Sequence, residues 1–173
     1  MIPLRGLTVL PLMIVNFDIS RKKSIRAVEA AMEQDQTIFL VTQRDPEEDQ
    51  PGIDGLYHTG TVAKIKNIAK LPKNIVRVMV EGVGRGRLLA MQEGTGYLLG
   101  QAEISEEEKP QFDELTKTAM VRALQDLLGR YGQINQKFGK DMMQQLMAIS
   151  DVEALVAEAG AHLPLFYEER QRI

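Results

Sequence analysis

The hydrophobic pattern of the chain changes its period between its two parts, and this change restricts the possible folds more than any other feature. In the first part, apolar residues alternate with polar ones, as at Val76, Val78 and Val80. In the second part, they recur at the spacing of helical turns. Alternation is typical of half-buried strands, and the longer period is typical of amphipathic helices. We therefore expect an α+β fold in which residues 1–108 are rich in strands and residues 109–173 are helical.

The β-rich part is expected to contain one helix among its strands. Apolar and β-branched runs predict strands at residues 4–10, 12–19, 37–42 and 97–104, and two long strands over 59–87 joined at 71–74. Between the second and third runs, Ile25, Val28 and Met32 form an apolar stripe with helical spacing. Asp18 or Ser20 precedes this helix, and we expect one of them to cap it.

Glycine occurs at every second position near the end of the second long strand. Gly82, Gly84 and Gly86 do not match a dinucleotide-binding G-x-G-x-x-G motif, and no clear helix start follows them. Glycine inside a strand marks a bulge or a close approach of another backbone. We therefore expect a bulge or a sharp bend here.

The second part is expected to form a small helical bundle. Helices are predicted at residues 115–131, 141–149 and 152–159. The buried side of the first is expected to carry Met120, Leu124, Leu127, Leu128 and Tyr131. Ser150, with Glu153 three residues later, forms a capping-box pattern before the third. A further helical run after Pro164 stops at Ile173, and we expect it to be the truncated start of a longer helix.

Composition excludes several classes of site. The chain of 173 residues has no Cys and only two His, His58 and His162. Thiolate nucleophiles and Cys-ligated zinc are therefore excluded, and the two His lack partners at metal-ligand spacing. A phosphate loop of the form G-x-x-x-x-G-K-[ST] is also missing from the sequence. We expect no catalytic residue, no metal and no cofactor in this chain.

The sequence predicts a cytoplasmic protein without a membrane partner. Its apolar runs are shorter than the roughly 18 to 20 residues of a membrane-spanning helix. Its start lacks the basic region, apolar region and cleavage site of a signal peptide.

Short motifs spread over nearly the whole chain occur in a specific order. They are Pro3-Leu4-Arg5-Gly6, Pro11 with Met13, Arg21-x-Lys23-Ser24-Ile25, Glu29-Ala30-Ala31-Met32, Gly60-Thr61, Leu71-Pro72, Val78-Met79-Val80-Glu81-Gly82, Arg85 and Ala161-His162-Leu163-Pro164-Leu165. In this order they resemble the N-terminal domain of Lon-type ATP-dependent proteases. The chain departs from the family at Lys73-Asn74, where a glycine is common in the hairpin, although Asn tolerates left-handed backbone angles.

The resemblance implies a fold and a function. The fold would be a PUA-like β-barrel or pseudo-barrel with one embedded helix, followed by a C-terminal helical bundle. The chain would be a non-catalytic domain that recognises unfolded or damaged protein substrates and helps subunits of a homo-oligomer, a hexamer, to assemble. ATP and Mg²⁺ would bind an ATPase domain that is absent here, and the Ser-Lys catalytic pair would lie in a further absent domain. The alternative is a free-standing PUA-like module that binds nucleic acid or a small ligand.

The basic start of the first helix is a candidate contact surface for clients or subunits. Lys22, Lys23 and Arg26 lie in or near its first turn. Positive charge at a helix N-terminus costs roughly 0.3 to 1 kcal/mol per exposed residue, because the macrodipole is positive there. Residues that break a local rule are more often functional. The plainer alternative is a solvated helix face.

The first long strand carries a candidate nucleic-acid surface. If residues 61–70 are extended, Lys64, Lys66 and Lys70 fall on one face and could follow a phosphate backbone. Aromatic residues make up only 5% of the chain, so bases would find few stacking partners. The alternative is a solvated strand face that prevents edge pairing.

Met142, Met143 and Met147 form a second candidate client surface. Methionine is adaptable and is common on promiscuous binding surfaces. The three cannot all face the same way on one helix, and the alternative is a place in the core of the helical bundle.

Overall fold

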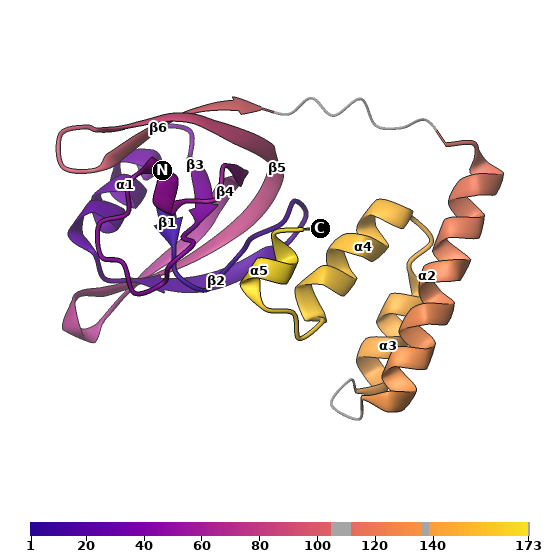
Figure 1. Cartoon of the computed structure of the whole chain (residues 1–173). Coiled ribbons are helices and arrows are strands. Elements are labelled where there is room, and N and C mark those ends of the chain that lie inside the picture. The colour runs from indigo at the N-terminus through magenta and orange to yellow at the C-terminus, as the bar shows by residue number, and fades with distance from the viewer. Residues whose placement is uncertain (105–111, 136–138, 173) are drawn as a thin grey trace. The chain divides into compact units, whose positions relative to one another are not determined.

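The computed structural model describes residues 1–104, 112–135 and 139–172 (Figure 1). The chain divides into two compact units. Unit 1 contains Met1–Glu106 and Pro164–Ile173, and unit 2 contains Glu107–Leu163. In sequence, unit 2 is therefore an insertion into unit 1.

Unit 1 is built on a mixed sheet. Its elements are β1 (Ile2–Leu4), β2 (Ile14–Ile19), α1 (Lys22–Met32), β3 (Thr37–Thr42), β4 (Thr59–Leu71), β5 (Ile75–Glu93), β6 (Leu98–Ile104), the short α5 (Tyr167–Arg170), and 3₁₀ turns at Ile53–Gly55 and Pro72–Asn74. The strand order is β1-β3-β4-β5-β2, and β6 pairs with β5. Only the β1–β3 pair among these is parallel. The expected mixture is confirmed, since the described residues form six strands and five α-helices.

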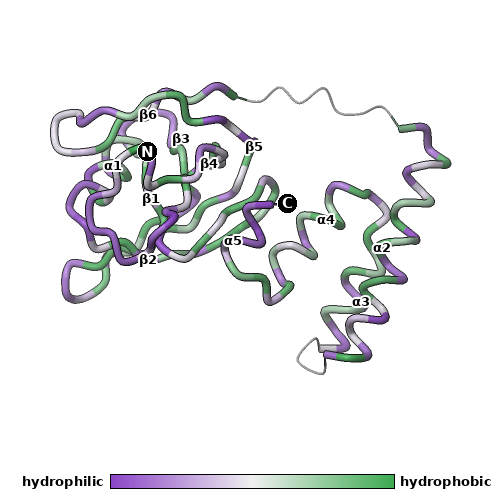
Figure 2. The backbone as a smooth tube through the Cα atoms, viewed as in Figure 1, coloured by the Kyte–Doolittle hydropathy of each residue, from purple (hydrophilic) through white to green (hydrophobic). Residues whose placement is uncertain are grey.

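Alternating residues of the two longest strands build the core of unit 1. Val76, Val78 and Val80 of β5 are buried on one face, as expected. Ile65 of β4 lies opposite Val80 and is also buried. The alternation of hydrophobic and hydrophilic residues can be followed along the strands in Figure 2. The period of two in the sequence therefore predicted this face correctly.

Helix α1 begins one turn later than a cap at Asp18 would require. Its N-cap position is Arg21, and among the described residues no side chain caps the helix, so the expected cap at Asp18 or Ser20 is wrong. The Asp18 carboxylate instead accepts hydrogen bonds from Nε and Nη2 of Arg77, at 2.7 and 2.8 Å. That bond to Arg77 lowers the pKa of Asp18. The carboxylate is thus engaged across the β2–β5 pair rather than at the helix.

The buried stripe of α1 is also rotated from the expected one. Ser24, Ala27, Val28 and Ala31 are its buried residues, whereas Ile25 and Met32 are only half-buried. The helix contacts β1, β3 and β6. Small side chains at these positions let its backbone approach the sheet closely. A prediction of the buried face that considers only large apolar residues does not identify a face made mostly of small residues such as Ser and Ala.

Most of the strand that was expected at residues 4–10 does not form, and a tight turn follows it at residues 10–13. The amide of Met13 donates to the carbonyl of Leu10 at 3.2 Å, and Leu12 has φ of 66°. Pro11 in the second position and a positive φ in the third are typical of a type II turn. β1 already ends at Leu4, and β2 starts at Ile14, directly after the turn.

The glycine-rich part of β5 contains the expected bulge. Val62 of β4 pairs with Gly84, and the next residue of β4 pairs with Gly82, so Val83 is an extra residue. Val83 is 56% exposed. A second shift inserts Lys66 as an extra residue in β4. At the hairpin tip, Lys73 and Asn74 have φ of 63° and 58°, so residues other than glycine adopt the left-handed conformation there.

Unit 2 consists of three helices around one apolar cluster. They are α2 (Glu114–Ile134), α3 (Lys140–Ala148) and α4 (Val152–His162). The buried members of the cluster are Val121, Leu128, Leu146, Leu155 and Ala159. Leu124 and Tyr131 pack against it, as expected, but Met120 is 36% and Leu127 is 60% exposed. The real buried face includes Val121 instead.

Aspartates cap two of these helices. Asp113 accepts a hydrogen bond from the amide of Thr116. Hydrogen bonding to the side chain of Thr116, and next to its amide, lowers the pKa of the Asp113 carboxyl group. Asp151 accepts a hydrogen bond from the amide of Ala154 at 2.8 Å. The expected capping box of Ser150 with Glu153 is therefore wrong by one residue. Both Ser and Asp are good N-cap residues, so neighbouring candidates compete.

The segment after Pro164 contains the four-residue α5 and packs within unit 1. Oγ1 of Thr8 lies 2.9 Å from the carbonyl oxygen of Tyr167, and Nε2 of Gln171 donates to the carbonyl of Thr59 at 2.8 Å. The compact units thus differ from the expected division, which placed 109–173 together. The expected boundary at residues 108 and 109, and Ile173 itself, lie outside the described residues.

Candidate binding site

A groove of about 410 Å³ lies in unit 1 beside the start of α1, and we call it the α1 groove. Its walls come from β1, the first turn of α1, the loop around residues 49–52, the end of β5 and the start of β6. The lining residues are Pro3, Arg21, Lys22, Lys23, Ser24, Asp49, Gln50, Pro51, Gly52, Met91, Glu93 and Leu98. Its size is within the range of ligand-binding clefts.

Hydrogen bonds within the loop over residues 44–55 hold one wall in place. Gln43 is buried, and its Nε2 donates to the carbonyls of Asp45 and Glu48 at 3.1 and 2.9 Å. Arg5 forms an ion pair with Asp49. Pro51 is buried as well. This polar, proline-containing loop is therefore anchored at both of its sides.

Arg21 joins the loop to β1. Its Nη2 donates to the carbonyl of Pro3 at 2.6 Å and its Nη1 to the carbonyl of Asp49 at 3.2 Å. Both partners are backbone oxygens. Burial, and next the nearby Arg5, lower the pKa of Arg21, whereas the charge of Asp49 raises it.

The three basic residues predicted as a contact surface have different environments. Lys22 is exposed and lines the α1 groove. Lys23 forms an ion pair with Glu93 at the end of β5. Arg26 lies over the turn between β5 and β6, where a Cβ at Gly96 would be 2.2 Å from its Nη1. Of the three predicted contact residues, only Lys22 and Lys23 therefore line the α1 groove, and Lys23 is paired with Glu93.

The lysines predicted as a nucleic-acid surface do not share a face. In the register of the two strands, Lys64 lies opposite Glu81 and Lys70 lies opposite Val76. The side chains of Glu81 and Val76 point to opposite faces of the sheet, because these residues are an odd number of positions apart in β5. Lys64 and Lys70 therefore also lie on opposite faces. The extra residue Lys66 reverses the alternation between them. The expected common face is wrong for this reason, since a bulge is not visible in the spacing of lysines.

Two of these lysines also make ion pairs. Lys66 pairs with Glu81 at 2.5 Å, and Lys64 pairs with Asp35 at 3.2 Å. Asp35 further accepts hydrogen bonds from the hydroxyl and the amide of Thr37. These bonds, with Lys64 as a smaller cause, lower the pKa of Asp35 to about 2. Within β4 the positive charge is thus partly compensated.

The three methionines of α3 do not form one surface. Met142 and Met143 pack against the apolar cluster of unit 2. Met147 is 38% exposed. A Cβ at Gly132 would lie 3.1 Å from the sulfur of Met143, so this methionine fills the space above a glycine of α2. Met142 and Met143 therefore match the alternative interpretation, in which these methionines belong to the core of the helical part.

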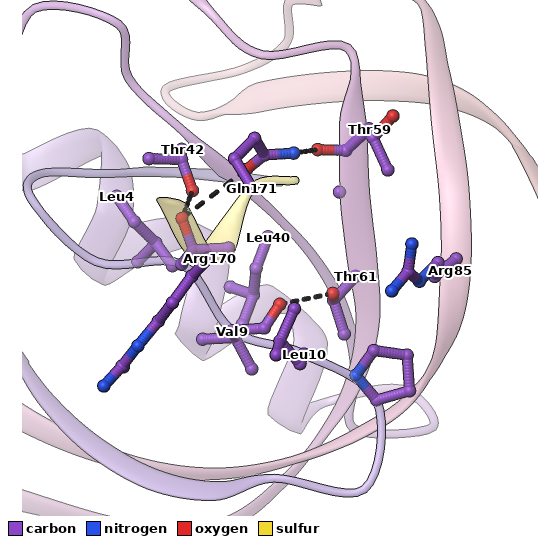
Figure 3. A pocket seen from close by; sticks show the side chains of 13 residues that line it. Leu4, Val9, Leu10, Leu40, Thr42, Thr59, Thr61, Arg85, Arg170 and Gln171 are labelled. Carbon is purple, nitrogen blue, oxygen red and sulfur yellow. Dashed lines mark hydrogen bonds between the residues drawn. The ribbon is translucent and has the colours of Figure 1, made fainter. Parts of the chain in front are cut away.

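A small cavity beneath the segment after Pro164 could not be anticipated from the sequence (Figure 3). It has a volume of about 20 Å³ and is lined by residues as distant in sequence as Thr8 and Gln171. Thr61 is buried there and donates from Oγ1 to the carbonyl of Val9 at 2.6 Å. A cavity of this size holds about one water molecule. Its polar groups serve to fix the segment rather than to bind a larger ligand.

Two further features concern metals and membranes. Within residues 1–104, 112–135 and 139–172, no group of three or more His, Cys, Asp or Glu side chains is arranged to hold a metal ion. His162 lies 3.1 Å from Oε1 of Glu158 in α4. The same described residues include no helix that combines the length and the apolar character needed to cross a membrane.

Sequence reasoning missed the apolar and loop residues of the α1 groove. Met91, Leu98 and Pro51 come from separate elements, and nothing in their spacing links them. Arg21 appeared in the sequence only within the motif Arg21-x-Lys23-Ser24-Ile25, with no role at a groove. The unfavourable charge at the helix start was the one signal that pointed to this region.

Comparison with known proteins gives a consistent family. A family model described as "ATP-dependent protease La (LON) substrate-binding domain" matches residues 1–173. The chain is 40% identical to the Lon protease of Lachnoclostridium phytofermentans over 170 residues, which is 98% of this chain and 21% of that protein. It is 35% identical to the Lon protease of Escherichia coli (strain K12) over 172 residues, 99% of this chain and 22% of that protein. The chain thus spans about a fifth of the length of these relatives.

Solved structures show the same fold. The N-terminal domain of a Mycobacterium avium complex Lon protease matches with a TM-score of 0.73 and 19% identity, over 99% of this chain and 86% of that one. A Lon N-terminal domain protein from Xanthomonas campestris matches with a TM-score of 0.55 and 12% identity, over 94% of this chain and 96% of that one.

Proposed function

Because the chain belongs to the ATP-dependent protease La (LON) substrate-binding domain family, we propose that it recognises unfolded or damaged proteins for a Lon protease. The match of the family model to all residues from 1 to 173 is the observation that carries this proposal. As this domain, the chain is not catalytic. Proteolysis, with ATP and Mg²⁺, would belong to the parts of the relatives that this chain does not span.

Exposed apolar side chains of unit 1 support a role in binding unfolded proteins. Leu12, Ile14 and Val83 are 54%, 67% and 56% exposed. They are neighbours, since the amide of Leu12 donates to the carbonyl of Gly82 and Ile14 pairs with Glu81. We call these three residues the edge patch. Clustered exposed apolar residues mark interaction sites, and unfolded chains present apolar segments.

The proposal includes the setting of the domain. Unit 1 would be a PUA-like pseudo-barrel and unit 2 a helical bundle, and the domain would contact other Lon domains and subunits of a hexamer in the cytoplasm. No observation favours the alternative of nucleic-acid binding: in the described part of the chain Lys64 and Lys66 are paired with carboxylates.

The test is a binding assay with the 173-residue chain. Reduced, unfolded casein labelled with fluorescein should raise its anisotropy on titration with the chain, and a labelled folded protein of similar size should not. The chain alone should hydrolyse neither ATP nor casein. If unfolded casein does not bind, and the remaining Lon domains do not bind the chain either, the proposed function is wrong.

A further inference from the structure

We propose that the α1 groove binds a client segment in which an apolar side chain is followed by a carboxylate, and this inference rests on the proposed function. Three properties of the groove support it, namely its charges, its apolar floor and its size.

The charges at the α1 groove are not balanced. Arg21, Lys22 and Lys23 line it together with the carboxylates Asp49 and Glu93. Glu93 is paired with Lys23, and Asp49 with Arg5, so both carboxylates are engaged.

Two cations remain without a carboxylate partner at the groove. Arg21 donates to the backbone carbonyls of Pro3 and Asp49 rather than to a carboxylate. Lys22 makes no ion pair within the described residues, and it is exposed at the rim. A positively charged rim attracts anions, and the anionic group of a polypeptide is the carboxylate.

The rest of the lining is largely apolar and firmly held. Met91 packs against the buried cluster of Val41, Leu56 and Leu88. Leu98 and Pro51 complete this floor, and Pro51 is buried. Methionine adapts its shape to different apolar partners, so the floor can accept more than one side chain.

A polypeptide segment satisfies both parts of the site at once. Successive side chains of an extended chain point to opposite faces, so an apolar side chain on the floor directs the carboxylate of the next residue outwards, towards the rim where Lys22 is exposed. A nucleic acid would bring phosphates but would leave the floor of Met91, Leu98 and Pro51 without an apolar partner. A volume of about 410 Å³ is too small for a folded domain and suits a few side chains.

The test uses three fluorescein-labelled Gly-Ser peptides and the 173-residue chain. The first carries a central Leu-Leu-Asp-Glu sequence, the second carries Leu-Leu-Asn-Gln, and the third carries Ser-Ser-Asp-Glu. The first should bind most tightly, and its affinity should fall as NaCl rises from about 50 to about 300 mM, since salt screens exposed charges. Each of the other two should bind at least about threefold more weakly.

Charge variants locate the site. Lys22→Glu should weaken binding of the Leu-Leu-Asp-Glu peptide by about threefold to tenfold, and Lys22→Arg should leave it unchanged. The matched control is Lys70→Glu, which makes the same charge change at an exposed lysine outside the groove lining. Thermal unfolding of each variant should match the parent chain, because both lysines are exposed.

Two outcomes overturn the inference. One is equal affinity for the Asp-Glu and Asn-Gln peptides, and the other is an equal loss of binding in Lys22→Glu and Lys70→Glu. Unfolded casein is titrated with the same preparations. If casein binds and the peptides are not distinguished, the groove inference fails while the proposed function stands. If casein does not bind at all, and the remaining Lon domains do not bind the chain either, the proposed function itself fails.

Discussion

A Cβ atom at Gly82 would lie 2.3 Å from the carbonyl oxygen of Leu10. The turn at Pro11 and the bulge of β5 therefore touch backbone to backbone. Two hydrogen bonds join them, from the amide of Leu12 to the carbonyl of Gly82 and from the amide of Gly82 to the carbonyl of Met13, each 2.9 Å long. This contact determines where β2 begins, and it places the edge patch on the surface of unit 1.

Gly82→Ala should destabilise unit 1, because neither backbone can move aside without breaking these hydrogen bonds. We expect a loss of about 1 to 3 kcal/mol in the free energy of unfolding, the usual range for overpacking. Urea unfolding followed by circular dichroism measures it. Gly84→Ala is the matched control on the other side of Val83, since a Cβ there meets nothing within 4 Å. Equal losses in the two variants would contradict the close contact as the cause.

Stability should depend on Asp35 at low pH. Its pKa is lowered to about 2, mainly by its hydrogen bonds with Thr37 and less by Lys64. The unfolded chain therefore binds more protons than the folded one between about pH 4 and pH 2. The contribution of Asp35 to stability is present above about pH 4 and is lost as the pH falls towards about 2. Urea unfolding over this range should show a weaker pH dependence in Asp35→Asn.

The carboxyl pKa itself separates the causes. In an NMR titration, Lys64→Met should raise the pKa of Asp35 by less than Thr37→Val does, because the hydrogen bonds from Thr37 are the larger cause. Thr37→Val removes only the hydroxyl bond and keeps the amide. A larger effect of Lys64→Met would mean that Lys64, through its hydrogen bond and its charge, controls this carboxyl group more than the hydroxyl of Thr37 does.

The core of unit 2 should depend on Leu155 and not on Leu127. Leu155 is 0% and Leu127 is 60% exposed. Leu155→Ala should lower the free energy of unfolding by about 2 to 5 kcal/mol, because it leaves a cavity among α2, α3 and α4. Leu127→Ala should change it by less than about 0.5 kcal/mol. A large effect of Leu127→Ala would restore the helix face that the sequence suggested.

The edge patch should contribute to the binding of unfolded casein. The double variant Ile14→Ser with Val83→Ser should weaken binding by about fivefold or more, since removing one apolar side chain from an interface costs on the order of 1 kcal/mol. Thermal unfolding should change little, because both side chains are exposed. The control is Ile104→Ser, which removes a side chain that is 62% exposed in β6. If this control weakens binding equally, the patch has no special role.

Local pattern was sufficient for several elements. The strand at Thr37–Thr42 and the face of Val76, Val78 and Val80 are confirmed. The hairpin tip after Leu71 is also where the sequence predicted it, and Asn74 adopts the left-handed conformation that was expected to replace glycine. These features depend on residues close in sequence, so periodicity and turn chemistry predict them.

The N-cap residues of the helices were harder to predict, because neighbouring polar residues compete for the same position. Asp18 was a good cap for α1, but its carboxylate binds Arg77 across the sheet. Ser150 was a good cap for α4, but Asp151 takes the position. The sequence does not show which partner a polar side chain will meet after folding, because the competing groups come from different elements.

By itself, the sequence determined the two periodicities, the order of strands and helices, and the ordered motifs that match the family. The tertiary structure decided the rest. It placed Tyr167 beside Thr8, put Lys66 and Val83 out of register, and brought Lys22, Met91 and Pro51 to one groove. The physical reason is that a period needs only neighbouring residues, whereas a docked segment, a register shift and a groove each depend on contacts between residues far apart in the chain.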